Sequence, residues 1–237
     1  MACTSKKLSL VVPCYNERDN IPLILSRFSE VMKRPDVELI LVDNGSTDDS
    51  AEVLKKHLPD YAFARSVHVQ INQGYGYGIC SGLEEAMGEF IGWTHADMQT
   101  DPCDALKGLK LFDAYGPNIF VKGRRYGRPF SDIAFTIGMS IFETLLLGKR
   151  MWDINAQPTM FPRKFYENWR DPPHDFSLDL FAYYQARMAD MDVYRFPVLF
   201  SERAHGVSHW NVNWAAKRKF IRRTINFSFQ LRKALKT

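Results

Sequence analysis

Four short strand-like runs, each followed by a polar loop, constrain the fold of this chain most strongly. They are "LSLVVP" (8–13), "VELILV" (37–42), "SVHVQI" (66–71) and "EFIGW" (89–93), and segments with helical spacing separate them. Apolar runs of this kind are typical of strands buried on both faces, and their alternation with helices favours an α/β fold with a mostly parallel, doubly wound sheet. Right-handed crossovers would bring the C-terminal ends of the strands to one edge, where such folds bind ligands.

The second half of the chain is less regular. The segments 118–125 and 193–200 have the composition of strands, and 135–147 and 177–188 have helical spacing. Between the two helical segments, residues 150–175 are rich in aromatic residues, proline and charge. We expect one α/β domain over residues 1–202 and a helical extension over 203–237.

Composition is that of an ordinary globular protein, with 46% hydrophobic and 24% charged residues. The four cysteines have no metal-binding spacing, which indicates reduced thiols and a cytoplasmic location. The longest uncharged apolar stretch, 133–142, is shorter than the roughly 20 residues needed to span a bilayer.

The extension is strongly basic. Residues 203–237 contain nine Lys or Arg and no acid, which leaves 22 basic and 27 acidic residues in 1–202. On a helical projection, one arc holds Lys219, Arg222, Arg223, Asn226, Gln230 and Lys233, and the other holds Phe220, Ile221, Ile225, Phe227, Leu231 and Leu235. This pattern fits an anchor on an anionic membrane surface, or a helix packed on its own domain or on a partner subunit. Nucleic acid is not an expected partner, because no nucleic-acid-binding motif accompanies the charge.

Polar residues follow each of the first four strands. In "IGWTHADMQTDP", His95, Asp97 and Gln99 alternate, so their side chains would point the same way in an extended segment. Asp43 and Asn44 follow the second strand and suit hydrogen bonding to a base or ribose. The glycines of "NQGYGYG" do not match the dinucleotide-binding pattern, and the chain has no P-loop motif.

In this order, "VVPCYNE", "LVDNGSTDDS", "NQGYGYGICSGLEEAMGEFIGWTHADMQTDP" and "WDINAQPTMF" resemble the family-2 glycosyltransferases of GT-A fold. The resemblance covers residues 8–208, and its nearest branch contains dolichyl-phosphate mannosyltransferase and other polyprenyl-phosphate glycosyltransferases. It implies inverting transfer of a sugar from a nucleoside-diphosphate donor, with Mg²⁺ or Mn²⁺ on the diphosphate.

The resemblance also implies site residues. The nucleotide-binding set is Pro13, Tyr15, Glu17, Asp43, Asn44, Asn72, Gly74, Ala96 and Asp97. Asp97 and Gln99 match metal-site positions, but His95 replaces the family's first Asp. His95 then either joins the metal site, contacts the donor as a neighbour of that site, or is a structural histidine at a strand end. Loss of one carboxylate also leaves metal-independent binding open.

The resemblance also implies residues for the acceptor side, in a basic segment and in a loop near residues 203–208. Arg124, Arg125 and Arg128 match the family's basic segment, and guanidinium groups suit phosphate recognition. Arg203 and Ser208 match a late loop over the donor phosphates, and His205 is a further metal candidate there. The catalytic set is Asp97, Asp153, Asp179 and Arg203, where Asp179 or Asp175 would be the base for a hydroxyl acceptor.

The expected function is transfer of a sugar from a GDP- or UDP-linked donor to a polyprenyl phosphate in cell-envelope glycan biosynthesis. The protein would be cytoplasmic or peripheral on the cytoplasmic face of the membrane, with the C-terminal helix on the lipid. One alternative is a family-2 enzyme acting on a hydroxyl of a surface glycan. Another is a degenerate, nucleotide-binding relative without turnover.

Overall fold

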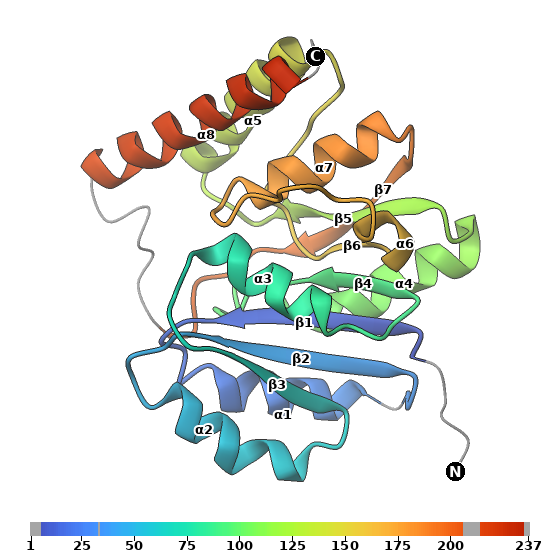
Figure 1. Cartoon of the computed structure of the whole chain (residues 1–237), viewed down its shortest axis with the longest axis vertical. Coiled ribbons are helices and arrows are strands. Elements are labelled where there is room, and N and C mark those ends of the chain that lie inside the picture. Colours follow the sequence, from blue (N-terminus) through green and yellow to red (C-terminus); the bar gives the residue numbers. More distant parts are fainter. Residues whose placement is uncertain (1–5, 33, 206–213, 235–237) are drawn as a thin grey trace.

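A seven-stranded sheet forms the centre of the molecule in the computed structural model, which describes residues 6–32, 34–205 and 214–234 (Figure 1). The strands are β1 (Leu8–Cys14), β2 (Val37–Asn44), β3 (Ala64–Val69), β4 (Phe90–Trp93), β5 (Ile119–Tyr126), β6 (Thr159–Pro162) and β7 (Asp192–Leu199). Their order is β3-β2-β1-β4-β6-β5-β7. β6 runs antiparallel to β4 and β5, and the remaining neighbours pair in parallel. The mostly parallel sheet expected from the sequence is therefore confirmed, with one reversed strand inserted.

Helices pack on both faces of this sheet. They are α1 (Ile21–Val31), α2 (Ser50–His57), α3 (Tyr75–Glu84), α4 (Asp104–Tyr115), α5 (Phe130–Leu147), α6 (Arg163–Tyr166), α7 (Leu178–Met188) and α8 (Trp214–Ala234), with a 3-10 turn at Leu58–Asp60. Buried residues of α1, α2 and α4 join one apolar core, and those of α3 and α7 join the other. The arrangement is thus helix layer, sheet, helix layer.

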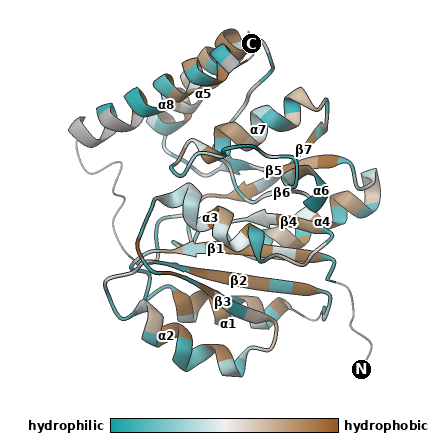
Figure 2. Ribbon diagram, in the orientation of Figure 1, coloured by the Kyte–Doolittle hydropathy of each residue, from teal (hydrophilic) through white to brown (hydrophobic). Residues whose placement is uncertain are grey.

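Every residue of β2 and β4 is buried, and so is every residue of β1 except Pro13. Both faces of these strands are covered by helices, which explains why their sequences are continuous apolar runs rather than alternating ones (Figure 2). α1 faces the sheet with Ile21, Ile24, Leu25 and Phe28, the spacing of a one-sided amphipathic helix.

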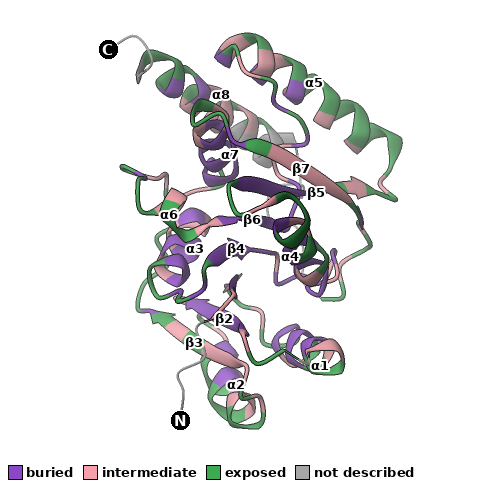
Figure 3. Ribbon diagram, turned by 90° about the vertical axis from the view of Figure 1, so that its right-hand side faces the viewer, coloured by how far each residue is buried: buried purple, intermediate pink, exposed green. Residues whose placement is uncertain are grey.

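α5 and α8 lie side by side at one end of the molecule, beyond β5 and β7 (Figure 1). Ser228 of α8 donates a hydrogen bond of 2.7 Å to the buried carboxylate of Glu143 on α5. The rest of α5 is largely exposed, and only 17% of its 18 residues are buried (Figure 3). α5 is the one helix among the described residues whose length and composition would allow it to cross a membrane. The prediction from the sequence covered only its uncharged part, 133–142, and therefore underestimated the length of this apolar helix. A single such helix is weak evidence for a membrane span.

Candidate functional site

The loops after β1, β2, β3 and β4 meet in one cleft of about 530 Å³ at the C-terminal edge of the parallel strands. This confirms the prediction that the four polar segments gather at a common edge. Most of the predicted site residues line the cleft: Pro13, Tyr15, Glu17, Asn44, Asn72, Gly74, His95, Ala96, Asp97, Gln99, Arg125, Arg128, Asp179 and Arg203.

Asp97 and Arg203 form an ion pair of 2.9 Å inside this cleft. Asp97 is 5% exposed, and its second carboxylate oxygen accepts a hydrogen bond from the backbone N–H of Gln99. Met98 between them has φ of 58°, which makes the tight turn that folds this carboxylate back onto its own loop. The backbone N–H groups of Ser201 and Ala204 bond to the carbonyls of Gln99 and Asp97, so the loop that carries Arg203 is fixed here.

His95 lies beside Tyr75, with ring centroids 6.5 Å apart. Burial lowers the pKa of His95, although the charges of Asp97 and Asp179 oppose the shift. A neutral imidazole has a lone pair for a hydrogen bond or a metal, and carries no charge with which to attract a hard cation.

Asp97 and Gln99 supply oxygen donors of the kind that Mg²⁺ and Mn²⁺ prefer. Within residues 6–32, 34–205 and 214–234 there is no cluster of three His, Cys, Asp or Glu side chains with metal-binding geometry. The residues present therefore fit a cation that takes a carboxylate from Asp97 and most of its other ligands from a diphosphate. They do not fit a cation held by the protein alone.

Glu17 occupies the part of the cleft next to β1. Burial raises the pKa of Glu17, partly offset by a hydrogen bond of 2.5 Å from Asn20. The backbone N–H of Glu17 bonds to Ser50 at 2.9 Å, and Asn16, at φ of 57°, accepts a hydrogen bond from the N–H of Thr47. These bonds join the loops after β1 and β2 into one side of the cleft.

The backbone conformation and a neighbouring carbonyl group both require glycine at position 74. Its φ is 117°, and a Cβ there would lie 2.3 Å from the carbonyl oxygen of His174. Gly76 would likewise meet the carbonyl of Pro173 at 2.3 Å. These glycines therefore allow a close approach of the segment 173–175, and Gly74 also lines the cleft.

Asp153 holds two of the predicted arginines in place. Its carboxylate accepts a 3.0 Å hydrogen bond from Arg125 Nε and lies 3.8 Å from Arg128. Burial alone would raise the pKa of Asp153, but the charges of Arg125 and Arg128 and the hydrogen bonds from Arg125 outweigh it and lower that pKa. Asp153 is not among the residues that line the cleft, whereas Arg125 and Arg128 are. Arg124 points to solvent, outside this cleft.

Asp179 is the least exposed acid among the residues that line the cleft. It is 2% exposed and accepts a hydrogen bond of 3.3 Å from the indole N–H of Trp93. Burial raises the pKa of Asp179, although the charge of Lys122 opposes this. Asp175, the other candidate base, does not line the cleft and instead pairs with Arg223 of α8 at 3.0 Å.

Three further predicted positions lie elsewhere. Asp43 is buried outside the cleft lining, where it pairs with His68 at 3.0 Å and accepts the backbone N–H of Ser46. The side chain of His205 is exposed and also outside the lining. Ser208 lies outside the described residues.

Aromatic residues that sequence reasoning missed complete the cleft. Tyr75 and Phe176 stack with centroids 4.6 Å apart, and Phe200 lies 5.4 Å from the guanidinium carbon of Arg125. The tyrosines between the glycines of "GYGYG" were the available signal for Tyr75. Phe176 and Phe200 come from distant parts of the chain and had none.

The sequence model described as "Glycosyl transferase family 2" matches residues 9–184 of this chain. Among named relatives, an undecaprenyl-phosphate 4-deoxy-4-formamido-L-arabinose transferase of Serratia proteamaculans is 34% identical over 170 residues, 68% of this chain and 51% of its own length. The namesake from Pectobacterium carotovorum is 32% identical over 165 residues, 67% of this chain and 49% of its own length. The matched region spans about a third to a half of the length of such relatives.

Solved structures share the fold. Glucosyl-3-phosphoglycerate synthase from Mycobacterium tuberculosis, in complex with UDP, superposes with a TM-score of 0.73 at 17% identity, over 96% of this chain and 80% of that one. The mannosyltransferase PcManGT from Pyrobaculum calidifontis, in complex with GDP-Man and Mn²⁺, gives a TM-score of 0.69 at 20% identity, over 99% of this chain and 66% of that one.

Proposed function

Because this chain belongs to glycosyl transferase family 2, we propose that it transfers a sugar from a nucleoside-diphosphate donor to a polyprenyl phosphate. An oxygen of the acceptor phosphate would attack the anomeric carbon from the face opposite the leaving group. The bond from that carbon to the diphosphate oxygen breaks, the nucleoside diphosphate leaves with the electron pair, and the configuration inverts. The relatives named for undecaprenyl-phosphate transfer support this class of acceptor.

The observation that carries the donor half is the Asp97–Arg203 pair at the meeting point of four polar loops. The residues that would hold the nucleoside line the same cleft: Pro13, Tyr15, Glu17, Asn44, Asn72 and Ala96. Arg203 would neutralise the charge of the diphosphate, which grows as the bond to the sugar breaks. The UDP and GDP-Man complexes of the structural neighbours support a nucleotide in a fold of this kind.

A divalent cation would rest on Asp97, with Gln99 as a second oxygen donor. When bound, such a cation stabilises the leaving diphosphate as a Lewis acid. The Mn²⁺ present with GDP-Man in PcManGT supports this assignment.

Arg125 and Arg128 would hold the acceptor phosphate, because both line the cleft and Asp153 fixes both guanidinium groups at the end of β5, three strands away from β1. A phosphate acceptor is already anionic and needs no general base. α5 begins just after these arginines and leaves Phe130 84% and Leu145 79% exposed. We propose that this apolar helix, with the basic helix α8 beside it, lies on the cytoplasmic face of the membrane that holds the lipid acceptor.

Asp179 favours a second candidate, a hydroxyl acceptor on a surface glycan. It is a buried carboxyl in the cleft with a raised pKa, which suits a general base. One variant distinguishes the two candidate functions. Asp179→Asn should reduce transfer to a hydroxyl by a factor of about 10²–10⁴, and should leave attack by a phosphate oxygen much less affected.

The test is to incubate the protein with UDP-, GDP- and dTDP-linked sugars and either undecaprenyl phosphate or a glycan acceptor, with and without Mn²⁺. Glycosylated lipid, detected by mass spectrometry, is the expected product. Product on the glycan alone would replace the first proposal with the second. Nucleotide binding without transfer or donor hydrolysis under every condition would identify a degenerate relative.

A further inference from the structure

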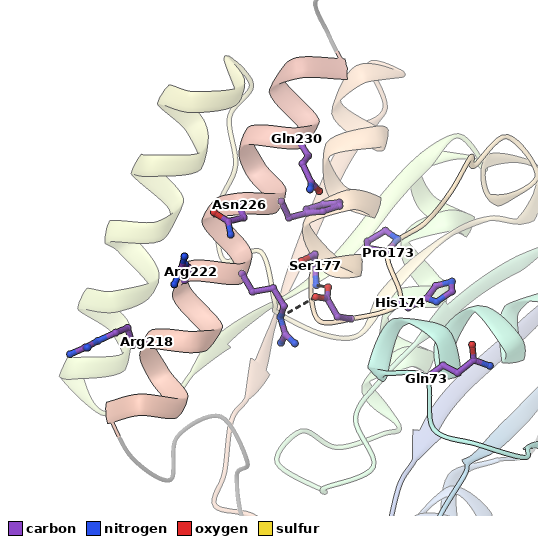
Figure 4. Close-up of a pocket in the computed structure, with 11 residues that line it drawn as sticks. Gln73, Pro173, His174, Ser177, Arg218, Arg222, Asn226 and Gln230 are labelled. Atoms are coloured by element: carbon purple, nitrogen blue, oxygen red, sulfur yellow. Dashed lines mark hydrogen bonds and ion pairs between the residues drawn. The ribbon is translucent and has the colours of Figure 1, made fainter.

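A second pocket, of about 710 Å³, lies outside the cleft and shares no lining residue with it. Figure 4 shows α8 on one side of this pocket, and on the other side Gln73 with the segment that carries Pro173 and His174. We call it the α8 pocket. Neither donor binding nor the acceptor arginines Arg125 and Arg128 account for it.

Charge in the α8 pocket is strongly one-sided. Its lining contains Arg218, Arg222 and Arg223 but one acid, Asp175. Asp175 pairs with Arg223 at 3.0 Å, the contact drawn as a dashed line in Figure 4. Arg218 and Arg222 are exposed and form no ion pair with any acid that the structure describes. Two positive charges of the pocket are therefore uncompensated.

These groups form a regular row. Arg218, Arg222, Asn226 and Gln230 follow one another at intervals of four residues, so they share one face of α8. Gln73 adds a third amide on the opposite side. The row offers guanidinium and amide N–H donors, while Phe227 and Pro173 give the pocket an apolar part.

We infer that the α8 pocket binds a phosphate monoester, through Arg218 and Arg222, at a site separate from the donor cleft. A phosphate monoester carries about −1.5 to −2 charges at neutral pH, which matches the two free arginines. Guanidinium groups bind phosphate oxygens with paired hydrogen bonds. The monoester is either a lipid headgroup at the membrane surface or a soluble phosphorylated compound, for which inorganic phosphate is the probe. This inference does not rest on the proposed transfer reaction.

The pocket is coupled in space to the cleft. Arg223 lies 5.7 Å from the ring of Phe176, and Phe176 stacks on Tyr75 at 4.6 Å, both of which line the cleft. A phosphate that also contacts Arg223 would compete with Asp175 for it. The ligand would then change the contact between Arg223 and Phe176, which lies between the two cavities.

The experiment compares full-length double variants of equal charge change. Arg218→Gln with Arg222→Gln removes the row, and Arg232→Gln with Lys233→Gln removes two exposed charges from the other end of α8, outside the pocket. Glutamine keeps helix propensity near that of arginine, so both variants should fold, which circular dichroism checks. Binding is measured with inorganic phosphate by calorimetry, and with vesicles containing phosphatidic acid or phosphatidylglycerol by sedimentation.

We expect the pocket variant to lose affinity about tenfold or more for phosphate or for phosphatidic acid vesicles, and the control variant to change much less. Loss with inorganic phosphate assigns a soluble phosphorylated compound, and loss with phosphatidic acid vesicles alone assigns a lipid headgroup. Equal losses in the two variants, or equal binding to phosphatidylglycerol, would show unspecific surface attraction and overturn the inference. Absence of binding to every probe would also overturn it. Because transfer is not the readout, an inactive enzyme would leave this result standing.

Discussion

Asp97 is the residue on which donor binding is expected to depend most. Replacing Asp97 with Asn removes a charge that pairs with Arg203 at 2.9 Å and that would hold the cation. A donor nucleotide at 100 times its Kd should stabilise the wild type by about 2.7 kcal/mol. In Asp97→Asn, the part of this shift that depends on Mn²⁺ should disappear, as thermal unfolding with and without the metal will show.

Asp101→Asn is the matched control for that variant. Asp101 pairs with Arg27 at 2.6 Å and does not line the cleft. It should unfold with the wild-type response to nucleotide and Mn²⁺. An unchanged Mn²⁺-dependent shift in Asp97→Asn would contradict the assignment of the cation to this carboxylate.

Lys122 makes stability depend on pH. Burial lowers its pKa to about 7, and its one hydrogen bond among the described residues is a 2.7 Å contact to Thr159. Between pH 7 and its ordinary pKa of 10.5, the unfolded chain holds a proton that the folded chain lacks, so this group makes stability rise with pH. The free-energy cost of burying the charged form of Lys122 is largest below pH 7.

Lys122→Met should therefore gain most over the wild type at pH 6 and lose that gain as the pH rises. The difference in free energy of unfolding should fall by up to about 1.4 kcal/mol per pH unit above pH 7, measured by urea unfolding. The lost bond to Thr159 adds a constant offset and does not affect this slope. A difference that is flat from pH 6 to pH 9 would contradict a neutral, buried Lys122. Lys110→Met, at an exposed lysine of α4, should show no such slope.

Sequence reasoning located most cleft residues because it needed no side-chain detail. Strand ends of a parallel sheet share an edge, so residues such as Glu17 and Asp97 had to come together. It did not separate residues that touch the cleft from those one layer behind. In sequence, Asp43 at the end of β2 and Asp153 in a polar loop look as available as Asp97, but in three dimensions they pair with His68 and Arg125.

At the scale of elements, the contact between α5 and α8 contains a buried acid. Burial raises the pKa of Glu143 to about 7, and Ser228 of α8 donates to it. Between pH 4.5 and 7 the folded chain binds a proton that the unfolded chain has lost, so the stabilising contribution is complete below pH 4.5 and is lost as the pH rises through 7. Docking of α8 on α5 should therefore weaken as the pH rises from 4.5 to about 7, and should be weakest above neutral pH.

Glu143→Gln keeps the hydrogen bond and removes the titration. Amide hydrogen exchange in α8, corrected for the intrinsic effect of pH, should become faster between pH 6 and pH 8.5 in the wild type but not in this variant. Glu52→Gln, at an exposed acid on α2, should behave as the wild type. Equal pH responses in Glu143→Gln and the wild type would rule out this carboxyl as the cause.

The strand β6 and the helix α4 were not predicted from the sequence, because their sequences only weakly show the patterns typical of strands and helices. β6 has four residues, begins after Pro158 and ends at Pro162, so its apolar pattern is too short to mark a strand. α4 starts after the turn "TDP", and its buried face contains Asp104, Ala105 and Gly108 beside Leu109 and Phe112, so few large apolar residues mark it. Both are formed by tertiary packing, since Met160 and Phe112 join the same apolar core. Long runs such as β2 needed no such help.

On the scale of the whole molecule, exposed apolar surface is concentrated on α5. Phe130, Ile133, Ile137, Ile141 and Leu145 share one face of this helix and are each at least 36% exposed. A continuous apolar face of this kind is typical of a membrane or protein contact. The proposed membrane position places this face on the lipid, next to the arginines of the acceptor side.

Ile141→Ser with Leu145→Ser tests that position, because neither residue lines the cleft. Each large apolar side chain contributes about 1.5–3 kcal/mol when fully buried, so sedimentation with lipid vesicles should weaken by about 10² or more. Transfer to undecaprenyl phosphate in vesicles should fall with it, while transfer to a short, water-soluble polyprenyl phosphate should remain. Ile71→Ser with Met87→Ser removes similar exposed apolar surface far from α5 and should change neither quantity. If the α5 variant instead loses a concentration-dependent self-association that the wild type shows, and its vesicle binding is unchanged, the face belongs to a second copy of the chain.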